Sequence, residues 1–131
     1  MDEIVRSENI TKTYRIGLLE VEALRVVSFS IIRGEFVSIM GPSGCGKSSL
    51  LYILGGLTRA SEGKLYVDGV DVSGYSLRKL TQLRRRKIGF VFQTLNLLPS
   101  LTVLENIRIS QGITSGNTQG MFHPVKLLEQ F

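Results

Sequence analysis

The chain contains the stretch Gly41-Pro42-Ser43-Gly44-Cys45-Gly46-Lys47-Ser48, which fits the pattern of a phosphate-binding loop. The apolar run Phe36–Met40 precedes it and the apolar run Leu50–Leu54 follows it, which predicts a strand, a loop and then a helix. Glycines let the backbone turn its N–H groups toward an anion, and the helix N-terminus attracts the same charge. The sequence therefore predicts a site for the phosphates of a nucleoside triphosphate.

The side chains of this loop have distinct predicted roles. Lys47 is expected to reach the β- and γ-phosphates, and the Ser48 hydroxyl is expected to ligate Mg²⁺. A glycine-rich surface turn before an ordinary helix is the alternative. The expected nucleotide contacts are Gly41, Pro42, Ser43, Gly44, Cys45, Gly46, Lys47, Ser48 and Ser49.

The bulk composition is that of an ordinary globular chain. Its 131 residues suffice for one modest core, and no apolar stretch approaches the length of a membrane span. The acidic start Met1-Asp2-Glu3 does not resemble a signal peptide. The single cysteine, Cys45, cannot form an internal disulfide and fits a reducing compartment. We interpret it as a small residue facing the loop interior; a thiol activated by the helix N-terminus is the alternative.

The net charge is +5, and the only basic run is Arg84–Lys87. A nucleic-acid-binding patch is the alternative interpretation of this run, but no interleaved aromatic residues or base-reading motif accompany it, so no nucleic-acid partner is expected. We interpret it as a solvated helix end, where cations suit the negative end of the helix dipole.

Patterning on both sides of the loop predicts alternating strands and helices. The expected strands are Asn9–Tyr14, Val26–Ile31, Phe36–Met40, Glu62–Asp71 (closed by an Asp-Gly turn) and Ile88–Phe92. The expected helices follow the phosphate loop as far as Gly55-Gly56, cover Leu77–Arg84, and open at a capping box over Thr102–Glu105. From Ser110 the chain is polar and without period.

Several further stretches make the chain resemble the nucleotide-binding domain of the ABC transporter family. They are Tyr14, Gly34-Glu35-Phe36, Ser61-Glu62-Gly63, Val67-Asp68-Gly69, Gly89-Phe90-Val91-Phe92-Gln93, Asn96-Leu97-Leu98-Pro99 and Leu101-Thr102-Val103-Leu104-Glu105-Asn106. The resemblance runs from Ile4 to Ile109, and the motifs are most similar to those of the lipoprotein-releasing and macrolide-export branch. It implies an α/β fold, a P-loop NTPase of ABC type with an antiparallel β N-terminal subdomain and an incomplete RecA-like parallel core.

The resemblance also implies cofactors, roles and partners. ATP and Mg²⁺ would be the cofactors, Tyr14 would stack on adenine, and Gln93 would contact Mg²⁺ and the attacking water, sharing catalysis with Lys47. The Gln93–Leu101 region would face a membrane permease, which would hold the chain at the cytoplasmic side of the inner membrane, and a second ATP-binding subunit would complete the assembly. Each role has an alternative. Tyr14 could simply fill one face of a strand, and Gln93 could be an ordinary polar residue at a strand end. The Asn96–Leu101 loop could be a buried anchor rather than a partner-facing surface.

After Asn106 the sequence departs from the family pattern. It contains no Leu-Ser-Gly-Gly-Gln signature and no apolar strand that ends in Asp-Glu, and the only histidine, His123, stands beside Pro124 without matching surroundings. We therefore expect residues 1–109 to be a partial nucleotide-binding domain and residues 110–131 a divergent tail, disordered or derived from a frameshift. The runs Phe36–Met40 and Ile88–Phe92 are expected to keep unpaired apolar edges.

Three functional hypotheses follow. The first is an ATP-binding subunit of an ABC transporter, of export or lipoprotein-release type, truncated here, that binds ATP without hydrolysing it efficiently. The missing motifs leave open whether this chain is an enzyme. The second is a non-catalytic nucleotide-binding or regulatory interaction module. The third, a kinase or GTPase, is disfavoured because no Asn-Lys-x-Asp motif is present.

Overall fold

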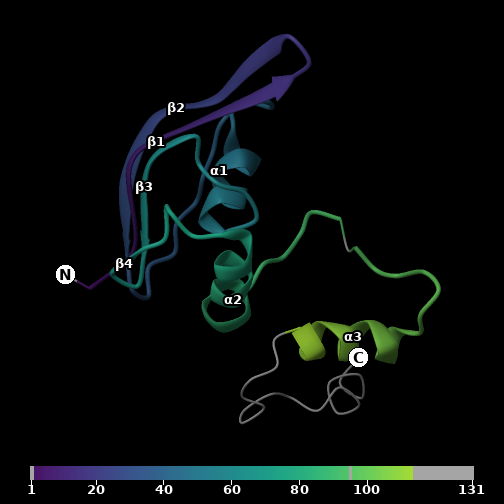
Figure 1. The fold of residues 1–131 in the computed structure, drawn as a ribbon. Coiled ribbons are helices and arrows are strands. Elements are labelled where there is room, and N and C mark those ends of the chain that lie inside the picture. The colour runs from purple at the N-terminus through teal and green to yellow at the C-terminus, as the bar shows by residue number, and fades with distance from the viewer. Residues whose placement is uncertain (1, 95, 114–131) are drawn as a thin grey trace. The chain divides into compact units, whose positions relative to one another are not determined.

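The computed structural model describes residues 2–94 and 96–113. Its elements are, in order, β1 (Glu3–Ile16), β2 (Leu19–Ile32), α1 (Lys47–Leu54), β3 (Glu62–Val67), β4 (Val70–Asp71), α2 (Leu77–Lys87) and α3 (Val103–Ile113). The described residues divide into two compact units, one that ends at Thr81 and one that begins at Gln82. Figure 1 labels the helices and strands along the chain.

The first unit is built on a four-stranded antiparallel sheet in the order β2-β1-β3-β4. β1 and β2 form a long hairpin in which Ile10 pairs with Val27 and Tyr14 pairs with Val21. The hairpin turns at Gly17, whose φ of 63° a glycine adopts without strain. β3 and β4 meet at the predicted Asp-Gly turn, where both residues have positive φ, as a tight hairpin requires. The predicted antiparallel N-terminal subdomain is therefore confirmed.

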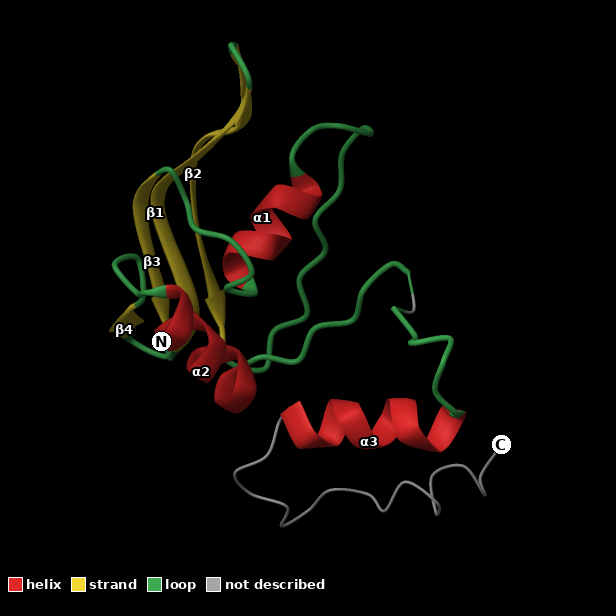
Figure 2. Ribbon diagram, turned by 45° about the vertical axis from the view of Figure 1, so that its right-hand side comes forward, coloured by secondary structure: helices red, strands yellow, loops and turns green. Residues whose placement is uncertain are grey.

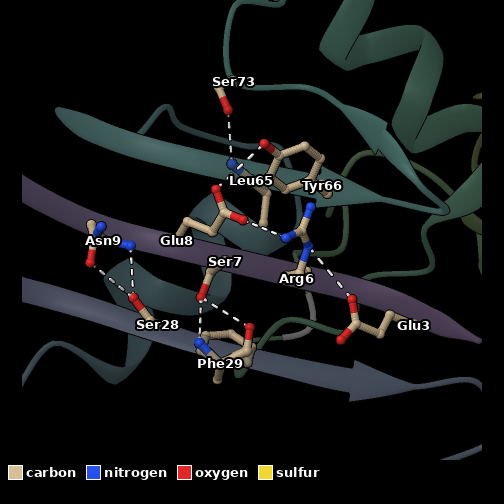
Figure 3. Close-up of polar contacts among 10 residues, drawn as sticks. All are labelled: Glu3, Arg6, Ser7, Glu8, Asn9, Ser28, Phe29, Leu65, Tyr66 and Ser73. Carbon is tan, nitrogen blue, oxygen red and sulfur yellow. Dashed lines mark hydrogen bonds and ion pairs between the residues drawn. The ribbon is translucent and has the colours of Figure 1, made fainter. Parts of the chain in front are cut away.

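Polar side chains hold the irregular part of the hairpin, where the register shifts between Ser7 and Ile10 (Figure 3). The buried Ser7 hydroxyl accepts a hydrogen bond from the Phe29 N–H at 3.0 Å, and the Asn9 N–H donates to Ser28 Oγ at 2.8 Å. These bonds satisfy backbone groups that the interrupted ladder leaves unpaired.

The core of the first unit lies between the sheet and the helix that follows the phosphate loop. α1 runs beside the sheet in both Figure 1 and Figure 2, and it buries Leu50 and Ile53, which share one helix face. The buried apolar residues of the described chain are Ile10, Leu24, Leu50, Ile53, Leu65, Val67, Val72 and Leu80. The packing of α1 on the sheet fixes the position of the phosphate loop at its N-terminus.

Two predicted strands are wrong. Phe36–Met40 and Ile88–Phe92 pair with no strand in the described ranges, and Phe36 and Val91 are each 96% exposed. An apolar run predicts burial, but a strand also needs a neighbour for its N–H and C=O groups, and no described segment supplies one. Because neither run forms a strand, the expected unpaired strand edges stay a prediction; what the structure shows is that apolar side chains such as Phe36 and Val91 are exposed.

The three predicted helices are present with somewhat different ends. α1 begins at Lys47 and stops at the Gly55-Gly56 pair, α2 continues three residues past Arg84, and α3 extends through Ser110 to Ile113. The predicted boundary between the partial domain and the tail, after Ile109, thus falls inside α3. The predicted tail beyond Ile113, including His123, lies outside the described residues.

The capping box that opens α3 is formed as predicted. The Thr102 N–H donates to Glu105 Oε2 at 2.8 Å, and the Glu105 N–H donates to Thr102 Oγ1 at 3.3 Å. The hydrogen bond from the Thr102 N–H lowers the pKa of Glu105 below its ordinary value. The Glu105 carboxylate therefore stabilises the helix fully above about pH 4.3, and this contribution is lost as the pH falls through the lowered pKa.

We expect α3 to lose protection from amide exchange as the pH falls through the lowered pKa of Glu105, because the capping carboxylate is then protonated. The measurement is amide exchange of α3 as a function of pH, with Glu105→Gln as the matched variant. The variant is expected to show less protection at neutral pH and no acid-induced loss of its own. If both proteins lose protection in parallel with pH, the capping carboxylate is not the cause.

Candidate nucleotide-binding site

The phosphate loop joins the extended segment after β2 to the N-terminus of α1, and its conformation depends on glycine. Gly44 and Gly46 have φ values of 81° and 95°, in the left-handed region. At Gly46 a Cβ would lie 2.3 Å from the carbonyl oxygen of Ala23 on β2. Only glycine fits there, so the loop is held close against the hairpin.

The N-terminus of α1 offers donors that no side chain uses. Gly46 occupies the N-cap position without a capping side chain, and the first turn contains no acidic residue. The first helical hydrogen bond runs from the Leu50 N–H to the Gly46 carbonyl at 2.9 Å, so the preceding N–H groups stand at the positive end of the helix. This donor set fits the phosphates of a nucleotide.

Lys47 places its charge over the same loop. Its Nζ donates to the carbonyl oxygens of Gly41 at 2.8 Å and Pro42 at 2.6 Å. Cys45 Sγ lies 3.6 Å from this ammonium and so near Gly41 that a Cβ there would approach it to 2.7 Å. The thiol therefore lies against the loop's own backbone, but Cys45 as a residue is exposed, so its predicted position in the loop interior stays a prediction.

Tyr14 of β1 lies near the phosphate loop because its hydroxyl contacts the first turn of α1. Its hydroxyl lies 3.3 Å from Ser49 Oγ, and the ammonium of Lys12 lies 4.9 Å from its ring centroid. Lys12 is itself held by a hydrogen bond of 2.7 Å to the Arg59 carbonyl. The position of Lys12 beside Tyr14 was not predicted from the sequence. It could have been, because residues two apart in a strand lie on the same face. The stacking of Tyr14 on adenine stays a prediction.

The predicted metal ligands remain predictions. Ser48 is exposed in the second position of α1, and Gln93 is exposed in the other unit of the chain. Within residues 2–94 and 96–113, no three His, Cys, Asp or Glu side chains gather into a metal site. A hydroxyl and an amide oxygen are suitable Mg²⁺ ligands when phosphate oxygens and water complete the octahedron.

The second unit contains an apolar hollow of about 640 Å³ beside the predicted partner-facing loop. Asn106 of α3 anchors this loop: its Nδ2 donates to the carbonyls of Leu98 and Leu101 at 3.2 Å each, and its Oδ1 accepts from the Leu98 N–H at 2.8 Å. Leu97 nevertheless remains 61% exposed, which argues against a buried loop anchor. The apolar lining includes Phe90, Val91, Phe92, Leu97, Leu98, Pro99, Leu101, Val103, Ile107 and Ile109.

Comparison with known proteins places this architecture in a family. A sequence model described as ABC transporter matches residues 24–130. The lipoprotein-releasing system ATP-binding protein LolD of Aquifex aeolicus is 50% identical over 107 residues, which are 82% of this chain and 46% of that protein. The macrolide export ATP-binding/permease protein MacB of Brucella abortus is 47% identical over 106 residues, 81% of this chain and 16% of that protein.

A solved structure shows the same fold. The ATP-binding cassette MJ0796 of Methanocaldococcus jannaschii, a dimer in a post-hydrolysis state bound to ADP and Pi, superposes with a TM-score of 0.83 at 44% identity. The match covers 95% of this chain and 54% of that one, so the chain spans about half the length of the cassette.

The fold and the loop define a P-loop domain of the ABC type, which confirms the predicted fold class. The chain belongs to the ABC transporter family. Among the helices of the described ranges, none combines the length and apolar character needed to cross a bilayer.

Proposed function

We propose that this chain is the ATP-binding part of an ABC transporter of the export or lipoprotein-release type. The observation that carries the proposal is the phosphate loop, with Lys47 Nζ over the loop carbonyls and the N-terminus of α1 free of side-chain caps. The names of the LolD and MacB relatives support the branch. ADP and Pi in the related cassette support a nucleotide ligand.

In this proposal each site residue has a separate task. The N–H groups at the start of α1 bind the phosphates, Lys47 neutralises the β- and γ-phosphate charge, and Tyr14 stacks on the base. Ser48 and Gln93 hold Mg²⁺, which would supply charge neutralisation at the phosphates. Gln93 would also orient the attacking water, as a positioning amide does in phosphoryl transfer.

We also propose that the chain by itself binds ATP without hydrolysing it efficiently. Phosphoryl transfer depends on charge placed around the γ-phosphate and on an oriented water. The sequence has no apolar strand ending in Asp-Glu that would supply a water-polarising carboxylate. The loss of one such group typically costs about 3 kcal/mol of transition-state stabilisation, which is a rate loss of roughly 100-fold. Residues 1–109 would then be a partial nucleotide-binding domain.

The partner-facing surface in this proposal is the Gln93–Leu101 loop with its apolar hollow. A membrane permease would insert an apolar element there, and it would hold the chain at the cytoplasmic face of the inner membrane. A second ATP-binding subunit would complete the assembly, as the dimer of the related cassette suggests. The exposure of Leu97 and the anchoring of the loop by Asn106 support a docking role.

The test is to measure ATP affinity and ATP turnover on the same purified chain. We expect saturable binding of Mg-ATP and a turnover no faster than that of the Lys47→Ala variant. Absence of binding would overturn the proposed function, whereas turnover clearly above the variant would overturn only the argument from the missing carboxylate. Firm binding without turnover, even beside a full-length subunit, would favour a regulatory nucleotide-binding module.

A further inference from the structure

The net positive charge of the chain comes from the helix α2. Six of its eleven residues are basic and none is acidic. The chain has sixteen basic and eleven acidic residues, so outside α2 the acidic residues are in slight excess. A net charge of +5 is therefore a local property of one helix rather than a diffuse property of the surface.

Four of these cations form one exposed face. Arg85 and Arg86 follow Arg78 and Lys79 by seven positions, which is two turns of this continuous helix and about 10 Å along its axis. All four are exposed, and Gln82 between the two pairs is exposed as well. Leu80 points the other way and is only 4% exposed. We call Arg78, Lys79, Arg85 and Arg86 the basic face of α2.

The basic face is not explained by the helix itself. Cations in the last turn suit the negative end of the helix dipole, as predicted for Arg84–Lys87, but Arg78 and Lys79 stand in the first turn, where the dipole disfavours them. Among the described residues no acidic side chain forms an ion pair with any of the four cations. Four cations on one side of one helix, without an ion pair to any described residue, indicate an anionic partner outside the described part of the chain.

We propose that the basic face of α2 binds the anionic phospholipid headgroups of a membrane surface. The inference rests on the proposed function, which holds the chain next to a membrane. Basic clusters on one helix face are attracted to anionic leaflets, with about a fivefold gain in affinity for each Lys or Arg near the surface. The face contains no apolar residue, so the contact is electrostatic and does not involve insertion. α2 contains no aromatic side chain that could stack on bases, and the half-buried ring of Tyr75 just before it already faces the Lys79 ammonium, 5.4 Å from its centroid. This disfavours a single-stranded nucleic acid.

The test is co-sedimentation of the full chain with vesicles made of equal parts of phosphatidylcholine and phosphatidylglycerol. We expect binding to these vesicles, none to pure phosphatidylcholine vesicles, and loss of binding as salt is raised toward about 1 M. The double variant Arg85→Gln, Arg86→Gln is expected to bind about 30-fold more weakly. The double variant Arg78→Gln, Lys79→Gln, which changes the other end of the face, is expected to lose a similar factor.

The matched control is Arg15→Gln with Arg25→Gln, which removes the same charge at side chains that are 80% and 81% exposed on the hairpin. Its vesicle binding is expected to stay near that of the wild type. An equal loss in the control, or full binding by both α2 variants, would overturn the proposal. Tighter, variant-sensitive binding to a duplex oligonucleotide than to vesicles would overturn it in favour of a nucleic acid. ATP affinity measured on the same α2 variants is expected to be unchanged, which separates this result from a failure of the nucleotide site.

Discussion

Lys47→Ala is expected to weaken ATP binding by about 10- to 150-fold. The ammonium of Lys47 is fixed over the loop by the carbonyls of Gly41 and Pro42, so it can meet a phosphate chain with little loss of side-chain freedom. A charge-assisted hydrogen bond is worth about 1.5–3 kcal/mol, and this free energy sets the expected factor. The measurement is a calorimetric titration with Mg-ATP.

The control for this variant is Lys64→Ala, which removes the same side chain from an exposed position on β3. Its ATP affinity is expected to match that of the wild type, because it contributes nothing to the loop. Lys47→Arg keeps the charge but not its compact shape, so we expect an intermediate affinity. If Lys47→Ala and Lys64→Ala bind ATP equally well, Lys47 does not contact the phosphates.

Gly46→Ala is expected to destabilise the first unit by about 2–5 kcal/mol and to abolish ATP binding at accessible concentrations. An alanine there must adopt a φ of 95° and place its Cβ 2.3 Å from the Ala23 carbonyl. The loop must then move away from β2, which displaces the N-terminus of α1. The measurement is urea unfolding followed by far-ultraviolet circular dichroism.

Gly44→Ala is the matched variant for this experiment. Its φ is 81°, so it shares the backbone strain, but no heavy atom lies within 4 Å of the added Cβ. We expect a loss of only about 1–2 kcal/mol and a folded protein. Equal losses for the two variants would show that left-handed strain alone matters and that the loop is not packed against the hairpin.

The parts of the fold that follow local rules could be predicted from the sequence. The glycines of the loop, the stop of α1 at Gly55-Gly56 and the capping box of Thr102 and Glu105 each depend on a few neighbouring residues. Such features are encoded by backbone freedom and by short side-chain hydrogen bonds, which a sequence pattern records directly.

The non-local parts could not be predicted in this way. Phe36–Met40 has the apolar pattern of a buried strand, but strand formation depends on a neighbour that the pattern does not contain. The contacts of Tyr14 with Ser49 and of Lys12 with the Arg59 carbonyl join residues far apart in the chain. Only the packing of α1 on the sheet brings these residues together. The surroundings of Tyr14 in the candidate site could therefore be seen only in the structure.

The most direct test of the central claim is to map ATP binding on the backbone amides of the full chain by nuclear magnetic resonance. We predict that Mg-ATP shifts the amide signals of Gly44–Ser49 and of Tyr14, and that Lys47→Ala needs about 10- to 150-fold more ATP to give the same shifts. The contradicting result is saturation with ATP that leaves the loop signals unchanged, or that shifts only the residues of α2, where the positive charge is concentrated.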